Sequence, residues 1–143
     1  MYFELKFMYI SPQTIHLFMK VLVVDDDAVN RLILKKVFEK ENDTVLTANN
    51  GLEAMDILTK ESDFHVVFTD IMLPLMDGIQ LLPEIKLNDS ISKIPIIGFT
   101  AGDIDYFKRS SVISFDRLLP KPMDFHELYD LAKKFGNGNL DLN

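Results

Sequence analysis

Short hydrophobic runs alternate with amphipathic segments along most of this chain. Five runs of strand-like composition lie at residues 21–24, 45–47, 66–68, 96–99 and 114–119. Hydrophobic runs of this length without strict alternation are typical of strands that are covered on both faces. We therefore expect five buried strands.

Four further segments carry apolar residues at the three- and four-residue spacing of an amphipathic helix. They lie at residues 29–37, 54–58, 79–85 and 125–132. Strands and helices thus alternate, and right-handed crossovers between parallel strands place helices on both faces of one sheet. The pattern predicts a single doubly wound α/β domain with a five-stranded parallel sheet.

Two places fit this pattern less well. Residues 102–114, between the fourth and fifth strands, are polar, and their apolar positions form no clear stripe. We therefore expect a further helix there, the fourth in chain order, to be short or mobile. Pro83 lies inside the third helical segment, where it lacks an N–H and crowds the preceding turn. A kink or a late helix start is expected there.

The clean pattern begins at Met19 and defines the expected domain as residues 19–135. Residues 1–18 are apolar and aromatic, but Glu4 and Lys6 interrupt them and no cleavage site follows, so a signal peptide is a poor fit. We interpret residues 1–18 as an N-terminal extension or linker. Residues 136–143 contain glycines and no periodicity, and we expect a flexible tail.

Composition narrows the functions that this domain can have. The 143 residues suit one domain, and the net charge of −7 disfavours direct binding of nucleic acid. No apolar run approaches the roughly 20 residues that a transmembrane helix requires. The chain has no cysteine, which excludes thiolate chemistry and is compatible with the cytoplasm. We therefore expect a cytoplasmic protein without a membrane anchor.

Polar residues follow four of the predicted strands. They are Asp25, Asp26 and Asp27 after the first, Asp70 after the third, Thr100 after the fourth and Lys121 after the fifth. The carboxyl ends of parallel strands meet at one edge of a sheet, where functional groups collect. Converging carboxylates repel one another unless a cation lies among them, and carboxylate oxygens suit Mg²⁺. A single aspartate after a strand is more often a helix cap, and Asp27 fits that alternative.

The four motifs that contain these residues resemble the receiver domain of two-component response regulators. VLVVDDD supplies Asp25 and Asp26, DIMLPLMDG begins at Asp70, FTA contains Thr100 and PKP contains Lys121. The resemblance covers residues 19–135 and implies a flavodoxin-like (βα)5 fold. It also implies that the Lys121–Pro122 peptide is cis.

The resemblance further implies the role of each site residue. Asp70 would accept a phosphoryl group from a phosphohistidine, with Mg²⁺ held by Asp26, Asp70 and the backbone carbonyl of Met72, and by Asp25 through water. Thr100 and Lys121 would contact the phosphoryl group. The surface formed by the fourth helix, fifth strand and fifth helix would then change for partner binding or relay.

Partners follow from the same resemblance. The donor would be a histidine kinase or histidine phosphotransfer protein, and the output a downstream protein effector. The chain would be a single-domain regulator or the receiver module of a hybrid kinase, and a monomer or a phosphorylation-dependent dimer. It would catalyse only its own phosphorylation and slow dephosphorylation.

Leu118 departs from the receiver pattern. It lies three residues before Lys121, where receivers usually carry a Tyr or Phe that moves together with the threonine. A leucine has no polar tip that distinguishes a buried from an exposed position. We expect Thr100 and Leu118 to form the switch, with weaker or different coupling through the fifth strand.

Two alternatives remain at this point. Residues 25–29 also match the DxDxV pattern of haloacid-dehalogenase-type phosphatases, in which Asp25 would be the nucleophile and Asp27 the acid/base. That family needs a further acidic pair after the lysine, but only Asp124 is near, and Asp70 has no role in it. A pseudo-receiver that is never phosphorylated is disfavoured because every acidic site residue is present.

Overall fold

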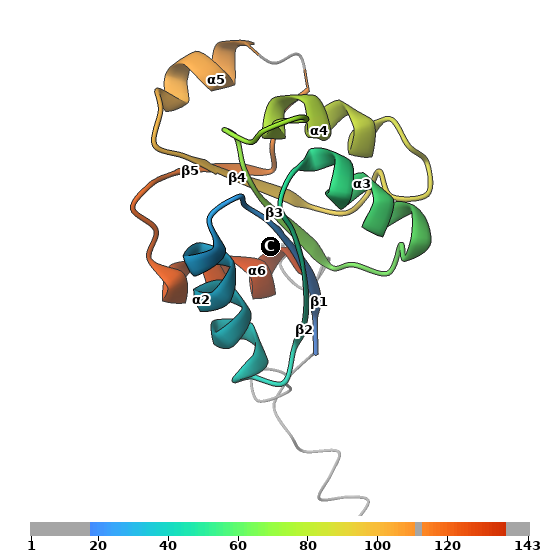
Figure 1. The fold of residues 1–143 in the computed structure, drawn as a ribbon, viewed down its shortest axis with the longest axis vertical. Coiled ribbons are helices and arrows are strands. Elements are labelled where there is room, and N and C mark those ends of the chain that lie inside the picture. The colour runs from blue at the N-terminus through green and yellow to red at the C-terminus, as the bar shows by residue number, and fades with distance from the viewer. Residues whose placement is uncertain (1–17, 111–112, 137–143) are drawn as a thin grey trace, which may run out of the picture.

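Five parallel strands form one sheet in the order β2-β1-β3-β4-β5. The computed structural model describes residues 18–110 and 113–136. The strands are β1 (Lys20–Val24), β2 (Thr44–Ala48), β3 (Val66–Asp70), β4 (Ile96–Thr100) and β5 (Arg117–Pro120). This sheet, which twists through the centre of the molecule in Figure 1, confirms the predicted fold class.

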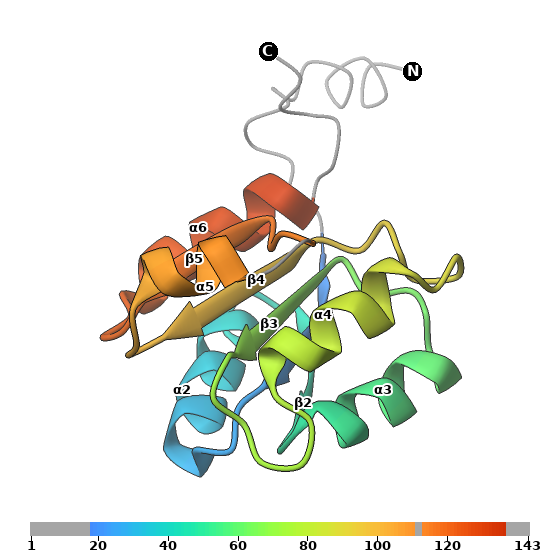
Figure 2. The same cartoon turned by 90° about the horizontal axis from the view of Figure 1, so that it is seen from above.

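Helices cover both faces of the sheet. They are α2 (Ala28–Glu39), α3 (Gly51–Lys60), α4 (Gly78–Lys86), α5 (Ile104–Ser110) and α6 (Phe125–Gly136). The sheet separates α2 and α6 from α3 and α4, and α5 lies beside β5 at the edge of the sheet (Figure 2). The site residues after β1 and β3 therefore lie at the centre of the sheet, between the two helical layers.

The side chains of β1 show why its run of apolar residues is continuous. Val21 and Val23 belong to the core cluster on the side of α2 and α6, together with Phe38. Leu22 and Val24 belong to the cluster on the side of α3 and α4. Successive strand residues point to opposite faces, so a strand between two helical layers is apolar at every position.

The fifth strand is shorter than predicted. We expected it from residue 114, but it begins at Arg117. Asp116 accounts for the difference, because its Oδ2 accepts the backbone N–H of Ile96 at 2.7 Å and the Nζ of Lys86 at 2.9 Å. The carboxylate takes an N–H at the start of β4 that a paired strand would otherwise use.

Pro83 does not delay the start of its helix. Asp77 caps α4, and its side chain and that of Gln80 form a capping box, so the helix begins at Gly78. The expected late start is wrong. The prediction of a short fourth helix is confirmed, since α5 has seven residues.

The two chain ends fall largely outside the described residues. This applies to residues 1–17 and 137–143, so the N-terminal extension and the flexible tail stay predictions. Gly136, which we assigned to the tail, is the last residue of α6. Within the described part of the chain, no helix is long and apolar enough to cross a membrane.

Candidate phosphoacceptor site

Asp70 ends the fully buried strand β3 and is itself only 4% exposed. Its Oδ1 accepts the backbone N–H of Met72 at 2.9 Å, and its Oδ2 accepts the Nζ of Lys121 at 2.5 Å. Lys121 comes from the far side of β4, 51 residues later in the chain. The fold thus places an ammonium group against the carboxylate at the end of a central strand.

Asp25 directly follows β1, which lies next to β3, and is fully buried. Its Oδ1 accepts the backbone N–H of Asp27 at 2.9 Å, and its Oδ2 accepts the Nδ2 of Asn30 at 3.2 Å. The backbone carbonyl of Asp25 accepts the guanidinium of Arg31 at 2.6 Å. These contacts from the first turns of α2 fix the carboxylate in place.

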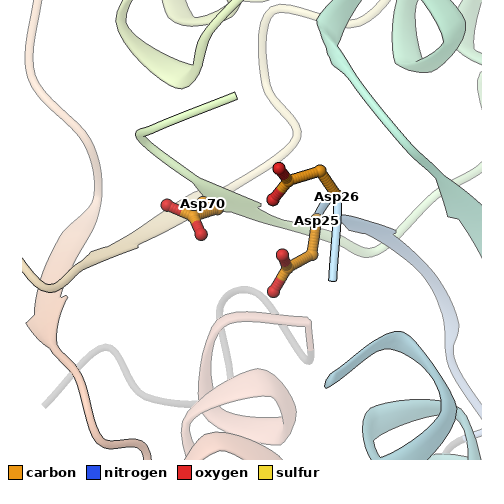
Figure 3. Close-up of side chains that lie close together, drawn as sticks. All are labelled: Asp25, Asp26 and Asp70. Atoms are coloured by element: carbon orange, nitrogen blue, oxygen red, sulfur yellow. The ribbon is translucent and has the colours of Figure 1, made fainter. Parts of the chain in front are cut away.

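Asp25, Asp26 and Asp70 form an acidic cluster. Carboxylate oxygens of the three residues lie within 4.8 Å of one another, and Asp26 is the exposed member. Figure 3 shows the three side chains extending from the neighbouring ends of β1 and β3. Grouped oxygens of this kind, with one side open to solvent, fit a hard divalent cation that keeps several waters.

Burial and neighbouring charges shift the pKa values of Asp25 and Lys121. Burial raises the pKa of Asp25, and the negative charge of Asp70 acts in the same direction. For Lys121, burial favours the neutral form, but the hydrogen bond to Asp70 and the surrounding carboxylates prevail and raise its pKa. The ammonium of Lys121 is therefore charged at neutral pH and held by the acids.

Thr100 and Leu118 lie along the boundary between β4 and β5. Thr100 is fully buried, its Oγ1 accepts the backbone N–H of Gly102 at 3.0 Å, and its carbonyl accepts the N–H of Lys121 at 2.9 Å. Leu118 is half-buried opposite Gly98, which has no side chain to compete for the space. The Lys121–Pro122 peptide is cis, as the resemblance implied.

The structure brings together most of the residues selected from the sequence. Asp27 instead caps α2, accepting the N–H groups of Val29 and Asn30, so its predicted role as a cap is confirmed. Met72 lies on the rim and its side chain is 64% exposed. Asn30 was not predicted, although a polar side chain on the first helical turn after an acidic pair is a usable signal for it.

Comparison with known proteins identifies the family of this chain. Residues 21–133 match the response regulator receiver domain family. The chain is 38% identical over 117 residues to sporulation initiation phosphotransferase F of Bacillus subtilis, covering 81% of this chain and 92% of that protein. The chain belongs to the response regulator receiver domain family. It is thus a receiver domain of two-component signalling, a phosphorelay switch.

Two solved receiver domains resemble this one over nearly their whole length. The signal receiver domain of a signal transduction histidine kinase from Syntrophus aciditrophicus has a TM-score of 0.77 and 25% identity, covering 86% of this chain and 93% of that one. The second is the receiver domain of Ssk1 from Saccharomyces cerevisiae, crystallised with the histidine phosphotransfer protein Ypd1. Its TM-score is 0.77 at 25% identity, and the match covers 91% of this chain and 98% of that one.

The phosphatase alternative finds no support in these comparisons or in the geometry. Asp25 is fully buried, and the ammonium of Lys121 donates to Asp70 and not to Asp25. Asp27, its supposed acid/base, is occupied in capping α2. Receiver domains bind Mg²⁺ at an acidic pocket, and this chain has a cluster of three aspartates.

Proposed function

We propose that Asp70 is the residue of this receiver domain that accepts the phosphoryl group. The observation that supports it is the position of Asp70 at the end of a central strand, with the ammonium of Lys121 at 2.5 Å and two further carboxylates within 4.8 Å. Asp25 is fully buried and Asp26 is exposed, whereas Asp70 accepts the ammonium of Lys121 and so has a positive charge against its carboxylate.

The carboxylates of Asp25, Asp26 and Asp70, with the backbone carbonyl of Met72, would hold one Mg²⁺, Asp25 acting through water. When bound, the ion supplies positive charge that neutralises the reacting oxygens and orients them. The chain itself holds two of these carboxylates in place by hydrogen bonds. Asn30 and the N–H of Asp27 hold Asp25, and the N–H of Met72 holds Asp70.

The proposed transfer is an in-line displacement at phosphorus. A carboxylate oxygen of Asp70 attacks, the new O–P bond forms as the N–P bond of the donor's phosphohistidine breaks, and the electron pair of that bond goes to the imidazole nitrogen. Lys121 keeps its ammonium beside the phosphoryl oxygens and stabilises their charge. Slow attack of water on the same phosphorus would return Asp70 to its carboxylate.

The switch starts from the hydroxyl of Thr100. That oxygen now accepts the N–H of Gly102, the second residue of the loop before α5. A phosphoryl group on Asp70 adds roughly 1.5 to 2 negative charges and three acceptor oxygens. If the side chain of Thr100 moves to donate its O–H to one of them, the hydrogen bond from Gly102 lengthens or breaks. The loop and α5 then rearrange most, and the surface of α5, β5 and α6 changes with them.

The donor is proposed to be a histidine kinase or histidine phosphotransfer protein that docks over α2 and the site loop. Four large apolar residues of α2 and the loop after β3 are exposed: Val29 at 63%, Leu32 at 53%, Met72 at 64% and Leu75 at 77%. A cleft between α2 and the segment after β5, lined in part by Ile33, Pro122 and Phe125, continues this surface. Scattered single apolar residues are normal, but a group beside a reactive site marks a contact surface.

Further parts of the proposal concern the surroundings of the domain. We place the protein in the cytoplasm, acting on a downstream protein effector as a monomer or phosphorylation-dependent dimer. The magnesium-dependent chemistry is its own phosphorylation and dephosphorylation, with no separate substrate.

Intact-mass spectrometry tests the assignment of Asp70. The protein is incubated with Mg²⁺ and a small acyl phosphate, and the wild type should gain the mass of one phosphoryl group. Asp70→Asn should gain none. Asp56→Asn, an exposed carboxylate on α3, is the matched control and should behave as wild type. An adduct that survives Asp70→Asn and disappears in Asp25→Asn would reject the proposal.

A further inference from the structure

The loop after β3, residues 71–77, carries the backbone of the site and contains a strained residue. Leu75 has a φ of 66° and an exposed side chain, a left-handed conformation that is unfavourable for a residue other than glycine. Such a conformation persists only where the surrounding contacts over-determine it. The loop therefore needs firm anchors on both sides of Leu75.

One anchor is close to Asp70. The N–H of Gly78 donates to the carbonyl of Ile71 at 2.9 Å, and a Cβ on Gly78 would lie 2.6 Å from the carbonyl oxygen of Asp70. This glycine allows α4 to start directly beneath the end of β3. The anchor closes the loop at its base but does not contact its far side.

The second anchor is Gly51, the first residue of α3. Its N–H donates to the carbonyl oxygen of Met76 at 2.8 Å, directly after the strained Leu75. A Cβ on Gly51 would lie 2.6 Å from that oxygen, 2.6 Å from the Cγ of Met76 and 2.8 Å from its Cβ. Real Cβ atoms essentially never approach this closely, so any other residue would displace Met76.

Space, not backbone conformation, explains a glycine at this position. The φ of Gly51 lies outside the left-handed region, and glycine is a poor helix former compared with alanine. Asn50 already caps α3 by accepting the N–H of Glu53 at 2.9 Å. An alanine would therefore suit the helix by itself, and the contact with Met76 is what opposes it.

We propose that Gly51 is a positioning residue for the phosphoacceptor site. Its N–H holds the carbonyl of Met76 against the start of α3, and through the short loop this contact, the latch, fixes Met72. The N–H of Met72 in turn holds Asp70, and its carbonyl is a proposed metal ligand. The expected effect on Mg²⁺ binding rests on the proposed function. The geometry of the latch concerns only the loop and α3.

Gly51→Ala tests the latch. The variant should bind Mg²⁺ about 10-fold more weakly than wild type, as is usual when the support of a metal ligand is lost. Its amide signals from residues 71–77 should shift in NMR spectra recorded without metal. Affinity is measured by calorimetric or NMR titration with MgCl₂, and the free energy of unfolding is measured by urea titration on the same samples.

Two matched variants separate positioning from stability. Met76→Ala removes the side chain but keeps the N–H···O bond from Gly51, so its Mg²⁺ affinity should stay near that of wild type. Leu58→Val weakens the packing of α3, where Leu58 is 1% exposed, in a helical turn remote from the latch. It should lose stability without losing Mg²⁺ affinity.

Wild-type affinity in Gly51→Ala would overturn the proposal, as would an equal loss in Met76→Ala or Leu58→Val. A wild type that binds no Mg²⁺ would reject the metal site of the proposed function instead. The latch is then judged by hydrogen exchange, in which the amide of Gly51 should be protected in wild type. An unprotected amide at residue 51, with unshifted loop signals in Gly51→Ala, would overturn it independently.

Discussion

The half of the sheet that holds the acids differs from the edge that holds β5. All five residues of β3 are buried, and β1 beside it is buried at four of five positions. In β5 the two end residues are exposed and the two middle ones are half-buried, and the neighbouring α5 has seven residues against twelve in α2. Elements with few buried contacts open and shift at lower free energy than a packed core.

This contrast separates chemistry from response. Asp25 and Asp70 stand on the packed half, and hydrogen bonds hold both carboxylates, so under the proposed function the phosphoryl group meets a fixed site. Lys121 follows β5 and reaches across to Asp70, so it joins the two regions. A change of charge at Asp70 therefore acts through Lys121 on β5 and α5, the region with the fewest buried contacts.

Removing a large ring from each region should show the contrast most strongly. Phe68→Ala in β3 removes a fully buried ring that packs on Phe38, and should lower the free energy of unfolding by about 3 to 5 kcal/mol. Phe107→Ala in α5 removes a half-buried ring and should lower it by about 1 kcal/mol. Urea titration measures both, and equal losses would remove the basis of the comparison.

The packed half carries a charge conflict that a single substitution relieves. Asp25→Asn keeps an oxygen for the N–H of Asp27, loses the acceptor for the Nδ2 of Asn30, and removes one negative charge beside Asp70. Without Mg²⁺ at neutral pH the variant should be more stable than wild type, on the order of 1 kcal/mol.

Thermal unfolding with and without MgCl₂ checks this expectation. Added Mg²⁺ should stabilise wild type more than Asp25→Asn, because ligand binding to the folded state raises its stability. Asp56→Asn, which breaks an exposed pair with Lys60, should change stability little. A less stable Asp25→Asn would mean that its carboxylate charge is compensated within the chain.

Much of this site was accessible from sequence because a parallel sheet gathers its strand ends. Asp25, Asp70, Thr100 and Lys121 were all identified as residues directly after strands, and no long-range contact had to be known. The structure gives Lys121 the partner Asp70. Their pairing depends on β5 lying two strands from β3.

The features that sequence did not predict depend on contacts between distant segments. Asp116 shortens β5 because it binds Ile96 and Lys86, which are 20 and 30 residues away. Gly51 matters because of the position of Met76, and nothing within α3 indicates that. The start of α4 is an exception, since the capping box of Asp77 and Gln80 that sets it is local.

The packed half should loosen at alkaline pH through α6. Burial, aided by the carboxylates of Asp43 and Glu41, raises the pKa of Tyr129 from 10.0 to about 12. Its neutral form is favoured in the folded state, so stability is fully present below pH 10.0 and is lost as the pH rises through about 12.

Comparison with Tyr129→Phe isolates this effect from the titration of lysines. The wild type should lose about 1 kcal/mol more than the variant over that pH range, after solvent screening is allowed for. Urea titrations at several alkaline pH values measure the difference. Parallel stability curves for the two proteins would show that Tyr129 does not sense pH in the folded state.

The smallest expected effect concerns the β5 edge and Leu118. Leu118 is already half-buried over Gly98, so phosphorylation should move it little. On adding beryllofluoride, a phosphoryl mimic, amide shifts in β5 should be smaller in wild type than in Leu118→Tyr, whose ring has a polar tip. Shifts of equal size in β5 of both proteins would show that an aromatic side chain adds nothing to the switch.

The claim that a phosphoryl group on Asp70 changes the β5 edge while β1 and β3 stay fixed can be tested directly. The measurement is a residue-resolved map of amide shifts and hydrogen exchange with and without beryllofluoride and Mg²⁺. We expect the largest changes, apart from the residues touching the ligand, in the loop and helix from Gly102 to Ser110, smaller changes in β5, and small changes in exchange along β1 and β3. We also expect Asp70→Asn to abolish the whole response. A response that persists in Asp70→Asn, or that loosens β1 and β3 while the β5 edge stays unchanged, would contradict the claim.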